Sequence, residues 1–158
     1  MEVDIMRLYF DCCCYNRPFD DQSQNRIHDE SEAVLSLINR CQKDNLGTVL
    51  GSTILKMEID RISDPAKKAK VSALSKAISE IIPYNEIIKK RAIEIQALAA
   101  IHEMDSLHIA SAEFANVDVF LSTDDKLLKA CHKISTKLKI RVKNPVSFLA
   151  EVIENDGY

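Results

Sequence analysis

The chain has 158 residues, 46% of them hydrophobic, so it is long enough for one domain with a sizeable buried core. Its 21 basic and 24 acidic residues give a formal net charge of −3, which excludes a global electrostatic attraction to nucleic acid or membranes. The sequence has no signal peptide, no run of about 20 apolar residues and an odd number of cysteines, so we expect a cytoplasmic protein without a membrane span or a disulfide framework.

A short apolar run near the start, Leu8 to Phe10, predicts a buried β-strand that ends at Asp11. In open parallel sheets the carboxyl ends of the strands form the crevice in which ligands bind, so Asp11 is a candidate site residue. The alternative is that Asp11 only caps the loop that follows. After this loop, apolar residues at helical spacing predict a helix over 26–43.

A second apolar run, Thr48 to Leu50, predicts another strand, and Ser52 or Thr53 caps the helix after it. Glu58 lies on the apolar stripe of this helix, where a carboxylate is costly to bury unless it is paired or bound to a metal. The alternative is that Glu58 lies at the edge of the stripe and reaches water. Two further helices, over 66–82 and 86–100, are predicted to form an αα-hairpin outside the sheet.

The last third of the chain repeats the pattern of a strand followed by a carboxylate. A helix begins near Asp105, and His108, on the same face, is interpreted as a packed core residue. The run 119–121 then predicts a strand that leads to Asp124, and 140–142 predicts a last, partly exposed strand before a final helix. Strands that alternate with helices predict a parallel α/β sheet with right-handed crossovers.

The order of these pieces resembles the PIN-domain ribonucleases, including the VapC-like toxins of toxin–antitoxin pairs. The segments that carry the resemblance are Leu8-Tyr9-Phe10-Asp11 with Asn16 soon after, Ser52 followed by Glu58, Asp105-x-x-His-Ile-Ala-Ser-Ala, Phe120-Leu121-Ser122-Thr123-Asp124, and Asn144-Pro145-Val146-Ser147-Phe148-Leu149. The resemblance spans nearly the whole chain. It implies a single PIN-like nuclease domain over 1–158, with a central parallel sheet of four to five strands flanked by helices.

The resemblance also implies a function and a site. It implies a metal-dependent endoribonuclease that acts on RNA, as a homodimer and with a small antitoxin protein as partner if the chain is a toxin. The residues that it assigns to an acidic site for Mg²⁺ or Mn²⁺ are Asp11, Glu58, Asp105 and Asp124. Asn16 and Ser122 are expected behind these ligands, and Ser122 replaces the threonine that the family often has there.

Some residue choices depend on position along the strands. Asp125 is adjacent to Asp124, but it would begin the next helix facing outward, so we expect Asp124 to point into the site. Asp118 precedes its strand and therefore lies at the wrong end of it. Hard carboxylate oxygens favour Mg²⁺ or Mn²⁺ over zinc.

A basic segment follows Asp124. It contains Lys126, Lys129, Lys133, Lys137, Lys139, Arg141 and Lys143, with no acid after Asp125. Some of these residues could guide an RNA backbone to the metal site, and Lys126 and Lys129 are the first candidates because they lie closest to Asp124 in sequence. The alternative is an ordinary solvated surface.

The sequence also bears on three other functions. A receiver-type signalling domain would need an adjacent pair of acids after its first strand, and a haloacid-type phosphatase would need a second aspartate after Asp11; the sequence has cysteines there. The remaining alternative is a PIN-like module that binds RNA or a protein without cutting. The presence of all four acids favours the nuclease over this alternative.

Overall fold

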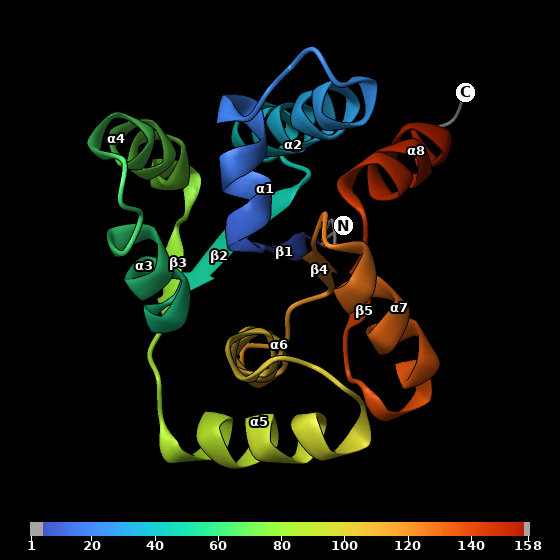
Figure 1. The fold of residues 1–158 in the computed structure, drawn as a ribbon. Coiled ribbons are helices and arrows are strands. Elements are labelled where there is room, and N and C mark those ends of the chain that lie inside the picture. The colour runs from blue at the N-terminus through green and yellow to red at the C-terminus, as the bar shows by residue number, and fades with distance from the viewer. Residues whose placement is uncertain (1–4, 157–158) are drawn as a thin grey trace.

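In the computed structural model, which describes residues 5–156, all the strands belong to one parallel sheet in the order β3-β2-β1-β4-β5 (Figure 1). β1 is the central strand and pairs with β2 on one side and β4 on the other. This confirms the predicted α/β fold with a parallel sheet. The strands are β1 (Met6–Phe10), β2 (Gly47–Ser52), β3 (Glu80–Ile82), β4 (Val119–Leu121) and β5 (Arg141–Lys143).

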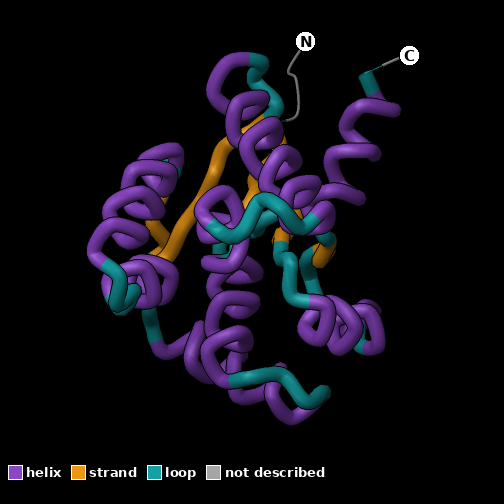
Figure 2. Tube along the Cα trace, turned by 45° about the horizontal axis from the view of Figure 1, so that its top comes forward, coloured by secondary structure: helices purple, strands orange, loops and turns teal. Residues whose placement is uncertain are grey.

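Helices cover both faces of this sheet. In Figure 1, α1, α2 and α8 lie above the strands, and α6 lies below them with α5 outside it. Figure 2 shows the same arrangement, with the strands enclosed by helices. The α-helices of the described residues are α1 (Cys12–Asn16), α2 (Asn25–Lys43), α3 (Thr53–Asp60), α4 (Pro65–Leu74), α5 (Glu86–Leu98), α6 (Glu103–Phe114), α7 (Asp125–Lys133) and α8 (Pro145–Asn155). None of them is long and apolar enough to cross a membrane.

The central strand β1 places alternate side chains on opposite faces of the sheet. Phe10 packs edge-on against Tyr15 of α1, with 5.9 Å between ring centroids. Tyr9 points to the other face, where it stacks on Phe120 at 5.3 Å and contacts His108 of α6. Asp11, two residues after Tyr9, is therefore directed toward the α6 side of the sheet.

The predicted αα-hairpin over 66–82 and 86–100 is wrong. α4 ends at Leu74, and residues 80–82 form the edge strand β3, which pairs with β2. A residue before proline is biased toward extended backbone, so Ile82 before Pro83 carried a signal for this strand. α5 instead packs against α6, and this pair lies on one face of the sheet (Figure 1).

Candidate metal centre

Asp11 lies where β1 ends, and only 6% of it is exposed. Its carboxylate is held on both sides: the Cys12 N–H donates to Oδ1 at 2.6 Å, and the Ser122 hydroxyl donates to Oδ2 at 3.0 Å. Burial raises the pKa of Asp11, and the charge of Glu58 raises it further, while His108 and the Ser122 hydrogen bond oppose this change. Asp11 is thus a fixed, desolvated carboxylate at the end of the central strand.

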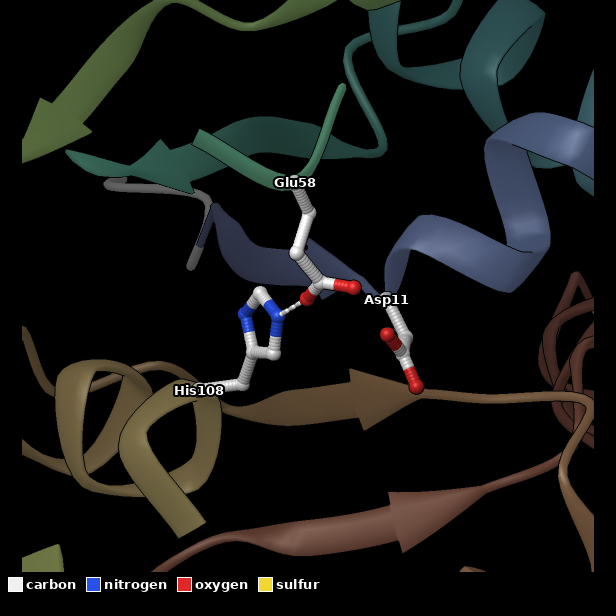
Figure 3. A group of neighbouring side chains, drawn as sticks. All are labelled: Asp11, Glu58 and His108. Atoms are coloured by element: carbon white, nitrogen blue, oxygen red, sulfur yellow. Dashed lines mark hydrogen bonds and ion pairs between the residues drawn. The ribbon is translucent and has the colours of Figure 1, made fainter. Parts of the chain in front are cut away.

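Glu58 reaches the same point from α3. Ser52 begins this helix by accepting a hydrogen bond from the Leu55 N–H at 3.0 Å, as expected for an N-cap serine. The side chain of Glu58 is 29% exposed, and its Oε1 forms a hydrogen bond with Nε2 of His108. Figure 3 shows Glu58 between His108 and Asp11, and one ligand atom from each of these three residues lies within 4.8 Å of the others.

Asp105 and Asp124 lie beside this group. Both line a cavity of about 90 Å³, together with His102 and Lys126. The pKa of Asp105 is raised to about 6, mainly by burial and also by the charges of Asp11, Asp124 and Glu58, while His108 opposes this rise. The four acids that the sequence predicted therefore act on one another electrostatically, although they come from four separate segments of the chain.

Asp124 is connected to Asp11 through one serine. The Asp124 N–H donates to the Ser122 hydroxyl oxygen at 3.1 Å, and the same hydroxyl donates to Asp11. Asp124 Oδ1 caps α7 by accepting hydrogen bonds from the N–H groups of Lys126 and Leu127, so the carboxylate cannot rotate freely. Ser122 thus contacts two of the acidic residues at once, and its role behind metal ligands stays a prediction.

The neighbouring acids point elsewhere. Asp125 is 57% exposed and forms a two-pronged ion pair with Arg26, at 2.6 and 2.7 Å. Asp118 accepts a hydrogen bond from the Arg7 N–H, at the opposite end of β1 from Asp11. The preference for Asp124 over both residues therefore agrees with the geometry.

Asn16, the other residue expected behind the ligands, contacts Cys12 rather than an acid. Its Nδ2 donates to the Cys12 carbonyl at 3.1 Å, and its Oδ1 is buried without a hydrogen-bond partner among the described residues. Its role at the site stays a prediction. The Cys12 thiol next to Asp11 is not primed as a nucleophile, because burial raises its pKa to about 12.

The two lysine candidates differ in position. Lys126 lines the cavity of Asp105 and Asp124, whereas Lys129 lies near Asp125, whose pKa is lowered mainly by Arg26 and also by Lys129. Further along the basic segment, Arg141 and Lys143 both form ion pairs with Glu151 of α8. Of the two candidates, Lys126 is therefore the one that lines a cavity together with two of the acids.

His108 was interpreted from the sequence as a core residue, and it is indeed completely buried, but its ring also contacts the acidic group. Burial would lower the pKa of His108, but its hydrogen bond with Glu58 and the charge of Asp11 raise it. The sequence signal was its position three residues after Asp105, which places the two side chains on one face of α6.

The residues at this site fit a hard divalent cation. A buried carboxylate facing other carboxylates is unfavourable unless positive charge compensates it, and the raised pKa values of Asp11 and Asp105 reflect this cost. Mg²⁺ and Mn²⁺ prefer carboxylate oxygens as ligands in proteins. This site offers such oxygens from Asp11, Glu58, Asp105 and Asp124.

Comparison with known proteins shows what this fold is similar to. A chain in the crystal structure of VapBC2 from Rickettsia felis, bound to a DNA fragment from their promoter, matches over 88% of this chain and 98% of that one, with 12% identity and a TM-score of 0.56. A chain in the structure of FitAB bound to an IR36 DNA fragment matches over 88% and 95%, with 16% identity and a TM-score of 0.56. The sequence matches no protein-family model and no curated protein. At these identities the likeness concerns the fold, and it shows that the chain has the PIN-like fold that its sequence resemblance implied.

Proposed function

We propose that this protein is a metal-dependent endoribonuclease. The observation that carries the proposal is the gathering of four acids at one end of the sheet: Asp11 and Glu58 approach each other within 4.8 Å, and Asp105 and Asp124 line one cavity beside them. Four acids from separate segments that repel one another at one end of the sheet are costly to keep unless they hold a cation. The fold shared with chains of VapBC2 and FitAB agrees with this proposal.

In this proposal the four acids hold Mg²⁺ or Mn²⁺. When bound, the cation polarises a phosphodiester and makes an attacking water more acidic. The chain itself orients the ligands: the Cys12 N–H and Ser122 fix Asp11, and the N-terminus of α7 fixes Asp124. Lys126 lines the cavity beside Asp124, where an ammonium group can neutralise a phosphate of the RNA backbone.

We further propose that the protein is the toxin of a toxin–antitoxin pair and acts as a homodimer. Two solved assemblies that contain a chain of this fold are named VapBC2 and FitAB, and both are bound to DNA. This supports a small antitoxin as partner. Co-expression with the product of a small neighbouring gene, followed by purification of the complex, tests this part separately from the chemistry.

RNA cleavage by the purified protein tests the central proposal. We expect cleavage with Mg²⁺ or Mn²⁺, none with EDTA, and loss of cleavage in Asp11→Asn. Asp125→Asn is the matched control, because Asp125 is adjacent to Asp124 but pairs with Arg26 outside the site. RNA binding without cleavage under any metal would contradict the proposal and favour the non-cleaving PIN-like module instead.

A further inference from the structure

A chain of hydrogen-bonded polar side chains leads to one of the four acids and has no role in the chemistry proposed above. It runs from Ser52 through Tyr9 and His108 to Glu58. The Tyr9 hydroxyl lies 2.6 Å from Ser52 Oγ and 2.6 Å from His108 Nδ1, and the opposite ring nitrogen, Nε2, forms the hydrogen bond with Glu58. Ser52, Tyr9 and His108 are almost completely buried, so these hydrogen bonds form away from water, and Ser52 Oγ also accepts from the Leu55 N–H.

With Glu58 ionised, as a metal ligand is, the protons along this chain fix the state of His108 Nε2. Tyr9 has a single hydroxyl proton. If it donates this proton to Nδ1 of His108, a neutral ring carries its own proton on Nε2. If Tyr9 instead donates to Ser52, Nδ1–H must donate to Tyr9, and an ionised Glu58 then requires a proton on Nε2 as well. In both arrangements Nε2–H donates to Glu58.

A nitrogen that carries a proton has no lone pair left for a metal. His108 therefore differs from Asp11 and Glu58, although its ring lies within ligand distance of both. Its hydrogen bond occupies Oε1 of Glu58, and the other carboxylate oxygen points toward Asp11 (Figure 3). The ring itself cannot turn, because Tyr9 holds Nδ1 and packs edge-on against it at 5.7 Å.

We propose that His108 is a positioning residue that orients Glu58 toward the metal, and that Tyr9 and Ser52 hold His108 in place. The inference rests on the proposed function, because it takes Glu58 as a metal ligand. Ser52 also begins α3, the helix that carries Glu58, so one serine fixes both ends of this arrangement. Groups that hydrogen-bond to metal ligands typically change metal affinity or activity by about 10–100-fold when they are removed.

Binding of Mn²⁺ to the whole chain, followed by the loss of its free-ion electron paramagnetic resonance signal, tests this proposal without any RNA. We expect His108→Leu to raise the Kd for Mn²⁺ by about 10–100-fold. His108→Gln should recover most of this loss, because its amide N–H can still donate to Glu58. Tyr9→Phe keeps the stacked ring but leaves His108 unanchored, and it should raise the Kd by a smaller factor.

Ser106→Ala is the matched control, because Ser106 is buried on the same helix and its hydroxyl has no hydrogen-bond partner among the described residues. This variant should bind Mn²⁺ as the wild type does. If His108→Leu does not fold, the Kd values of His108→Gln and Tyr9→Phe for Mn²⁺ still test the proposal. Unchanged affinity in all the folded His108 and Tyr9 variants would overturn the proposal.

A spectroscopic signature separates positioning from ligation. Electron spin echo modulation of bound Mn²⁺ should show no nitrogen coupled directly to the ion, and a directly coordinated nitrogen that disappears in His108→Gln would overturn the proposal. Mn²⁺ binding that depends on His108, in a protein that cleaves no RNA, supports this inference while refuting the nuclease. A wild type that does not bind Mn²⁺ at millimolar concentration refutes both.

Discussion

Replacing Asp105 with asparagine removes one charge from a place where carboxylates face one another. Without metal, this charge is unfavourable to the fold, since burial and the charges of Asp11, Asp124 and Glu58 raise the pKa of Asp105 from 3.8 to about 6. We therefore expect Asp105→Asn to be more stable than the wild type in EDTA at pH 7. A substitution at this proposed metal ligand should thus stabilise the protein while it impairs metal binding.

The size of this effect follows from the pKa. At about 1.4 kcal/mol per pKa unit, the rise corresponds to about 3 kcal/mol for a group shielded from water. Asp105 is only partly buried, so solvent screening reduces the expected gain to about 1–2 kcal/mol. For a chain of this length, that gain raises Tm by about 3–6 °C.

The pH dependence has a definite sign. Because the pKa of Asp105 is raised in the folded state, folded protein holds this proton more tightly than unfolded protein does, and wild-type stability falls as the pH rises between about 4 and 6. Below about pH 4, Asp105 is protonated in both states, so the advantage of the variant disappears. Above about pH 6 the advantage is complete.

Thermal unfolding in EDTA at pH 4 and pH 7 measures this difference. Glu103→Gln is the matched control, because Glu103 is an exposed acid in the same first turn of α6. It should lose about 0.3–1 kcal/mol of helix-dipole stabilisation and gain nothing. Saturating Mn²⁺ should then reverse the order of wild type and Asp105→Asn, since the wild type gains RT ln(1 + [L]/Kd).

A loss of stability in Asp105→Asn as large as that in Glu103→Gln, in EDTA at pH 7, would refute this prediction. The acids would then not repel one another enough to require a cation. An equal advantage of the variant at pH 4 and pH 7 would also refute it, because ionisation of Asp105 could not be the cause.

Three further results are expected. Mg²⁺ or Mn²⁺ should raise the wild-type Tm, and Asp11→Asn should reduce this rise; an identical metal-induced shift in the variant would refute Asp11 as a ligand. The Lys126→Ala/Lys129→Ala double variant should flatten the log–log salt dependence of RNA binding in Ca²⁺ by about 0.7 per lost phosphate contact, whereas unchanged affinity and slope would mean that RNA enters elsewhere. Glu30→Gln should cost about 2–3 kcal/mol in denaturant unfolding, because it removes the buried carboxylate that pairs with Arg17 at 2.9 Å and leaves Arg17 with Asp20 alone, and a loss below 0.5 kcal/mol would show that the pair is dispensable.

The strand-end acids could be predicted from the sequence because their position depends on local features. Leu8 to Phe10 and the run 119–121 are short, apolar and buried, and each leads to a carboxylate. Parallel strands end at the same edge of a sheet, so Asp11 and Asp124 had to lie near each other once both strands were assigned. β3 was missed because the strand has only three residues and lies at the edge of the sheet, where Ile81 is exposed.

The two acids on helices, Glu58 and Glu30, could not be distinguished by such local features. Glu58 was chosen because it lies on an apolar stripe, but Glu30 has the same signal on α2, with Ala33, Val34 and Leu37 on its face. The structure separates the two: the carboxylate of Glu30 is 2% exposed and is neutralised by arginines, whereas Glu58 faces Asp11. Such partners lie far apart in sequence, so only the family resemblance could distinguish the two acids beforehand.

The location of the site follows from the order of the strands. From β1 the chain builds outward through β2 to β3, and it then returns to the other side of β1 to add β4 and β5. The connections therefore diverge between β1 and β4, which leaves a crevice at the carboxyl ends of these two strands. Asp11 and Asp124 follow these two strands, and α3 and α6 bring Glu58 and Asp105 to the same crevice. The topology thus places a crevice at these strand ends, and the four acids that line it favour a cation as the ligand.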